Sequence, residues 1–61
     1  MKHTEHDYHE RGYRLERSTS TERRLKLSKE LRLMLSTETL DDQHEARKLI
    51  ERGRQEARLN H

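Results

Sequence analysis

The 61-residue sequence contains no cysteine, proline, tryptophan, phenylalanine or valine. Without cysteine, the chain has neither a disulfide framework nor a thiolate zinc site. No apolar run approaches the roughly 18 residues that a membrane-spanning helix needs. No apolar stretch follows the basic residue near the beginning of the chain, so we expect no secretory signal. These absences predict a cytoplasmic protein that has no membrane partner.

Hydrophobic residues are also scarce: they make up 26% of the sequence, whereas 43% of the residues are charged. Leucine supplies nine of the 16 apolar residues, and Ile50 is the only β-branched one among them. Leucine, methionine and alanine favour helices, and a chain without valine or phenylalanine makes a poor sheet. The charges of both signs are interleaved, which favours helices with salt bridges over a self-repelling coil. We therefore predict an all-α protein.

So few apolar residues can form only a small core, and a chain of this length is marginally stable on its own. Association with a second copy, or folding on a partner, would supply the missing burial. The composition therefore predicts a homodimer or another homo-oligomer.

Two capping signals predict where helices begin. Thr19 followed by Glu22 matches a capping box, and Thr39 with Asp42 repeats the pattern with aspartate in the third position. We predict helices at about 20–36 and 40–58. A linker of about four residues would join them into an αα-hairpin, which forms the domain at 19–61.

The first 18 residues form a polar, His-rich segment before this hairpin. Tyr8, Gly12 and Leu15 recur at helical spacing, which favours a short helix. Gly12 inside the pattern costs about 1 kcal/mol relative to alanine, which favours a flexible arm instead. His3, His6 and His9 stand three apart and could share a metal on a helical turn. Because a terminal arm is a poorly ordered place for such a site, we predict neither a metal nor a cofactor.

Apolar residues occupy more than one face of the predicted helix at 20–36. One face carries Leu27, Leu31, Met34 and Leu35, whereas Leu25 and Leu33 lie off it. This pattern predicts contacts with two neighbours, such as a helix of the same chain and a second subunit.

The predicted helix at 40–58 has a single apolar face, made of Ala46, Leu49, Ile50, Gly53 and Ala57. Gly53 and Ala57 would let another helix approach closely, in the same chain or across a dimer. The alternative is that Gly53 is merely a tolerated interior glycine. We assign helix packing or dimer contacts to Leu25, Leu33, Leu49, Gly53 and Ala57.

Positive charge is concentrated on the first of these two helices. Residues 21–36 contain five basic and two acidic residues, whereas residues 1–20 balance and residues 37–61 carry one more acid than base. Arginine and lysine are natural partners of phosphate groups. The alternative is a solvated face that keeps a Leu-rich helix soluble. The candidate contacts to a partner or to nucleic acid are Arg23, Arg24, Lys26, Lys29 and Arg32.

The sequence argues against an enzyme. It has no cysteine nucleophile, and only two glycines, 41 positions apart, so no glycine-rich loop can hold a phosphate. Its hydroxyl side chains cluster at helix breaks, where capping explains them. A chain with so small a core does not easily form a concave pocket. We therefore predict no catalytic residues.

We predict a small regulatory or accessory protein that acts by helix-mediated contact with another protein, such as a host regulatory protein. Its Arg-rich, Cys-free composition is similar to that of small accessory proteins of phages and plasmids. The alternative is a DNA-binding regulator that uses residues 23–32. It would be ribbon-helix-helix-like, with a strand in the alternating stretch 23–27, or helix-turn-helix-like. A third hypothesis is an antitoxin-like adaptor that stays partly disordered until it meets its target.

Overall fold

The computed structural model describes residues 1–60, which form three helices. They are α1 (Glu5–Arg17), α2 (Thr21–Ser36) and α3 (Leu40–Leu59), and the described residues contain no strand. The predicted all-α class is confirmed, and α2 and α3 begin and end within one residue of the predicted bounds. Residues 23–27 lie inside α2, so they do not form the strand that a ribbon-helix-helix fold would need.

Threonine side chains cap two of the three helices. Thr39 Oγ1 accepts a hydrogen bond from Asp42 N–H at 3.2 Å, which confirms the predicted start of α3. Thr4 caps α1 in the same way through Asp7 N–H at 3.1 Å. The predicted capping box at Thr19 is wrong, because α2 begins after Ser20, whose side chain makes no capping hydrogen bond. α2 therefore begins at Thr21, one residue later than predicted.

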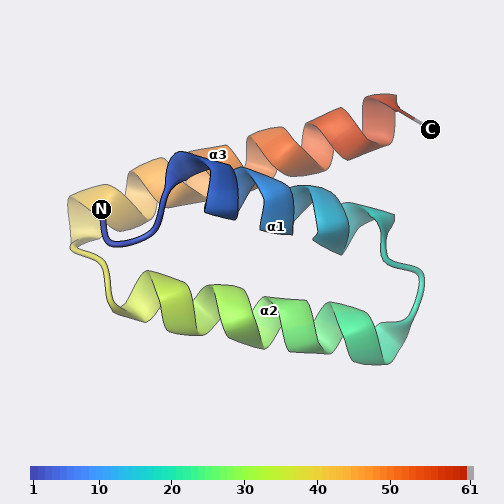
Figure 1. The fold of residues 1–61 in the computed structure, drawn as a ribbon, viewed down its shortest axis with the longest axis horizontal. Coiled ribbons are helices and arrows are strands. Elements are labelled where there is room, and N and C mark those ends of the chain that lie inside the picture. Colours follow the sequence, from blue (N-terminus) through green and yellow to red (C-terminus); the bar gives the residue numbers. More distant parts are fainter. Residues whose placement is uncertain (61) are drawn as a thin grey trace.

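The main helix pair is α1 and α3, which run side by side in the same direction (Figure 1). α2 runs back between the end of α1 and the start of α3 and packs more loosely against both. The expected hairpin of α2 and α3 is therefore not the centre of the fold. Two parallel neighbours cannot be joined by a tight turn, so α2 serves as the connection that returns the chain to the beginning of α1.

Two glycines explain why α1 and α3 pack so closely. A Cβ atom at Gly12 would overlap the backbone carbonyl oxygen of Ile50, and one at Gly53 would overlap that of His9. The Cβ at Gly53 would also lie 3.0 Å from the backbone nitrogen of Tyr13. These obstacles are backbone atoms, so no change of rotamer can relieve the overlap. The close approach expected at Gly53 is thus made to α1 of the same chain.

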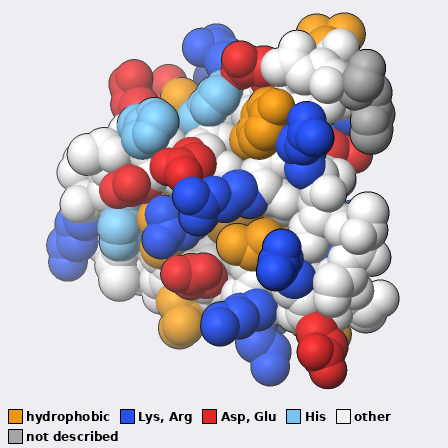
Figure 2. Space-filling model, turned by 45° about the vertical axis from the view of Figure 1, so that its right-hand side comes forward, with side chains coloured by type: hydrophobic (Ala, Val, Ile, Leu, Met, Phe, Trp, Pro, Cys, Tyr) orange, Lys and Arg blue, Asp and Glu red, His pale blue; other side chains and the backbone are white. Residues whose placement is uncertain are grey.

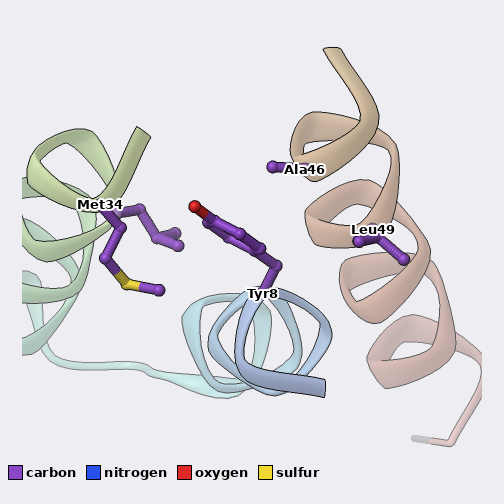
Figure 3. Packing of buried hydrophobic residues seen from close by; sticks show 5 residues of the cluster. Tyr8, Met34, Ala46 and Leu49 are labelled. Carbon is purple, nitrogen blue, oxygen red and sulfur yellow. The ribbon is translucent and has the colours of Figure 1, made fainter. Parts of the chain in front are cut away.

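Tyr8 lies at the centre of the hydrophobic core. Its side chain has an exposed fraction of 0% and extends from α1 into the space between α2 and α3 (Figure 3). Met34 approaches it from α2, and Ala46 and Leu49 approach from α3. The cluster also contains Leu31, and Leu15, Leu35 and Ile50 pack against its edge. A single aromatic ring therefore joins all three helices.

Ion pairs join the two main helices beyond the core. Arg54 Nε donates a hydrogen bond to Glu16 Oε1 at 3.0 Å, and Arg58 Nε lies 3.5 Å from the other carboxylate oxygen. The hydrogen bond from Arg54 is the main reason why the pKa of Glu16 lies below its ordinary value. Near the middle of the pair, His9 of α1 contacts Glu56 of α3. Ion pairs that stay in contact with solvent, as these partly exposed ones do, add little stability, so the glycine contact determines the packing.

The glycine contact can be tested by Gly53→Ala. In an ordinary helix this substitution stabilises by up to about 1 kcal/mol. Here we expect the free energy of unfolding to fall by about 1–3 kcal/mol, because the added methyl group forces α1 away from α3. Urea denaturation followed by circular dichroism measures the change. Ser28→Ala, at an exposed position in α2, is the control and should not lower stability. A more stable Gly53→Ala variant would contradict the close approach.

Candidate interaction surface on α2

α2 buries only one side. Leu31 and Met34 face the core, whereas Leu25 and Leu33 have exposed fractions of 58% and 69%. Successive residues of a helix are rotated by about 100°. On this basis Leu25 and Leu33 share the side of α2 that points away from the core. These two leucines were predicted to contact a second neighbour of the helix. Within residues 1–60, no other part of the chain covers them.

Three basic residues accompany the exposed leucines. Lys26, Lys29 and Arg32 fall within the same arc of about 120° around the helix axis, and all three are exposed. We define the outward face of α2 as Leu25, Lys26, Lys29, Arg32 and Leu33. Glu22 lies at its beginning and is the acidic residue of this arc. The face therefore combines exposed apolar surface with a net positive charge.

The structure separates the other two predicted basic residues from this face. Arg23 lines a pocket together with Arg14 and Arg17 of α1. Arg24 lies near Glu16, and its charge contributes to lowering the pKa of that carboxyl group. Among residues 1–60, none of the five predicted basic side chains forms an ion pair. Figure 2 shows basic side chains beside exposed hydrophobic ones on the side where α1 leads into α2.

The predicted packing residues of α3 lie inside the single chain. Leu49, Gly53 and Ala57 are buried, and Gly53 faces the backbone of α1. The apolar stripe of α3 is therefore covered by α1. Of the five residues assigned to helix packing or dimer contacts, only Leu25 and Leu33 remain open to another molecule.

A buried carboxylate, which was not predicted from the sequence, lies at the end of the core. Glu38, in the linker between α2 and α3, has an exposed fraction of 8%. Its Oε2 accepts a hydrogen bond from Tyr8 O–H at 2.8 Å, and its Oε1 accepts one from the backbone N–H of Lys2 at 2.7 Å. Glu38 thereby ties this linker to α1 and to the beginning of the chain. A single glutamate in a linker carries no periodic signal that could have predicted this role.

The pKa values of Tyr8 and Glu38 move in opposite directions. Burial raises the pKa of Tyr8 above its ordinary value, and the hydrogen bond to Glu38 raises it further. Burial also raises the pKa of Glu38, but hydrogen bonds from the Lys2 backbone, from Tyr8 and from the His3 backbone outweigh it. The pKa of Glu38 therefore lies below its ordinary value, and the pair consists of a neutral phenol and a carboxylate.

The three N-terminal histidines point to different partners. The ring of His3 meets the ring of Tyr8 edge-on at 5.8 Å, His6 lies 3.2 Å from Glu10, and His9 contacts Glu56. Residues 1–60 contain no group of three metal-ligating side chains that could hold an ion. Within the same residues, no helix has the length and apolar character needed to cross a membrane.

Comparisons with protein-family models, with curated proteins and with solved structures find no match to this chain.

The buried carboxylate predicts a pH dependence of stability. Because the pKa of Glu38 is lowered in the folded chain, its stabilising contribution is complete above the unfolded value of 4.5. It is lost as the pH falls below 4.5 and through the folded pKa. The stability difference between the wild-type protein and Glu38→Gln should therefore shrink as the solution is acidified. Urea denaturation at several pH values measures this difference. Glu45→Gln, at an exposed position, is the matched control. A difference for Glu38→Gln that stays constant with pH would contradict the assignment.

Proposed function

We propose that this chain is a non-enzymatic regulatory or accessory protein that binds another protein through the outward face of α2. The observation that carries the proposal is the exposure of Leu25 and Leu33 on one side of a helix whose other side is buried. Exposed leucines framed by charged side chains are typical of a contact surface. The Arg-rich, Cys-free composition supports an accessory role of the kind found in phages and plasmids.

The two leucines would supply most of the affinity. Fully burying one leucine contributes about 1.5–3 kcal/mol, so covering both at their present exposure yields on the order of 2–4 kcal/mol. Each surface ion pair adds at most about 1 kcal/mol. The three basic residues would mainly steer the encounter and select the partner, because charge complementarity acts on association rates and specificity.

The charge of this face favours an acidic protein as the partner. Lys26, Lys29 and Arg32 of two copies would repel one another if two outward faces met. The homodimer predicted from the small core is therefore the weaker form of the proposal. α3 does not offer a dimer contact at Gly53 and Ala57 either, because α1 of the same chain already covers both residues.

DNA binding is the alternative, and one observation favours it. The five basic side chains of α2 are exposed and form no ion pairs within residues 1–60. Free cations of this kind are available to phosphates. Against it, Leu25 and Leu33 lie between the cations, where a phosphate backbone offers no apolar surface. We therefore place protein binding first.

The proposal predicts selective binding of an acidic amphipathic helix. The probe is a fluorescein-labelled helical peptide with leucine on one face and glutamate beside it. A second peptide, with lysine replacing glutamate, reports the charge requirement. We expect the acidic peptide to bind and the basic one not to bind, as measured by fluorescence anisotropy. Leu33→Ser should weaken binding by about tenfold, which corresponds to the loss of about 1.4 kcal/mol.

Leu40→Ser is the matched control, because Leu40 is 73% exposed but lies on α3, away from the outward face. It should leave the affinity unchanged. Equal losses in Leu33→Ser and Leu40→Ser would refute the outward face as the binding surface. Steeply salt-dependent binding of mixed-sequence duplex DNA, together with no binding of the acidic peptide, would establish the DNA alternative.

A further inference from the structure

An open pocket lies where the end of α1 meets the beginning of α2. Its volume is about 450 Å³, and it is lined by Tyr13, Arg14, Arg17, Ser18, Arg23 and Leu27. The volume falls within the range of small-molecule sites. None of these residues belongs to the outward face of α2, so the pocket is a separate feature of the surface.

The lining of the pocket is cationic. Three of its six residues are arginines, and none is acidic. Arg14 is paired with Glu10, and Arg17 Nη1 donates a hydrogen bond to Tyr13 Oη at 3.3 Å. Arg23 forms no ion pair within residues 1–60. At least one guanidinium is thus free, and a second is held only by a neutral phenol.

The helix dipoles explain only part of this arrangement. Arg14 and Arg17 lie in the last turn of α1, where positive charge complements the dipole. Arg23 lies near the beginning of α2, at the positive end of that helix, where a cation is unfavourable. An anion held between the two helix ends would offset the unfavourable position of Arg23.

A buried hydroxyl group supports the same reading. Ser18 Oγ is buried and has no hydrogen-bond partner within residues 1–60. Leaving such a group unpaired is unfavourable. Ser18 lies in the lining between the arginines of α1 and Arg23 of α2. Because this oxygen atom is shielded from solvent, the hydroxyl group would have to turn into the pocket to meet a ligand oxygen, while Tyr13 and Leu27 offer an apolar wall.

We propose that this pocket binds a phosphate monoester whose organic part rests on Tyr13 and Leu27, as in a nucleoside monophosphate. Guanidinium groups bind phosphate oxygens through paired, charge-assisted hydrogen bonds. Arg17 and Arg23, from different helices, would hold the phosphate between them. The proposal does not depend on protein binding by α2, because the two sites share no residue.

Titration of the ¹⁵N-labelled full chain with adenosine monophosphate tests the proposal. We expect saturable amide shifts at Ser18 and Arg23, weaker binding of inorganic phosphate, and no saturable shift with adenosine. Arg17→Gln and Arg23→Gln should each raise the dissociation constant about tenfold. Arg52→Gln removes the same charge from an exposed position on α3 and should leave the dissociation constant unchanged.

The variant Ser18→Ala distinguishes specific binding in the pocket from a general electrostatic attraction of anions to the chain. Because the hydroxyl has no partner in the free chain, this variant should bind adenosine monophosphate severalfold more weakly without a lower melting temperature. The proposal is overturned by an absence of saturable shifts, by equal weakening in Arg52→Gln, or by adenosine binding as tightly as its monophosphate. Binding of the acidic peptide should be unchanged in Arg23→Gln, so the two proposals can fail independently.

Discussion

The backbone contact between α1 and α3 is the constraint on which the rest of the structure depends. Gly12 and Gly53 each face backbone atoms of the opposite helix, and a methyl group at either position would overlap a carbonyl oxygen. This contact lets the two parallel helices lie close together and covers the apolar stripe of α3. It also leaves α2 to connect them, and therefore on the outside of the pair.

The position of α2 follows from Tyr8. Its ring is the central aromatic side chain of the core, and its hydroxyl group binds Glu38 in the linker after α2. α2 contributes Leu31 and Met34 to this core and packs Leu35 against its edge, so its opposite side faces solvent. The outward face and the arginine pocket are both consequences of a connecting helix that is held along one side only.

The sequence predicted the helices better than their arrangement. Helix-forming leucines and the Thr39–Asp42 cap located α2 and α3, because these signals are local. The pairing of α1 with α3 was not predictable in the same way. An apolar stripe indicates that a helix is covered but not by which neighbour, and the nearest helix along the chain was assumed. The arginine pocket was missed because Arg14, Arg17 and Arg23 belong to two helices that meet only in the folded chain.

The most direct test of this account is a nuclear Overhauser measurement between Gly12 and Ile50. The sample is an equimolar mixture of labelled and unlabelled chains, so that contacts within one chain can be distinguished from contacts between chains. The account predicts cross-peaks between Gly12 Hα and Ile50 that arise within a single chain. Cross-peaks that appear only between chains would show that α3 packs against a second copy, and would contradict the central role of the intrachain contact.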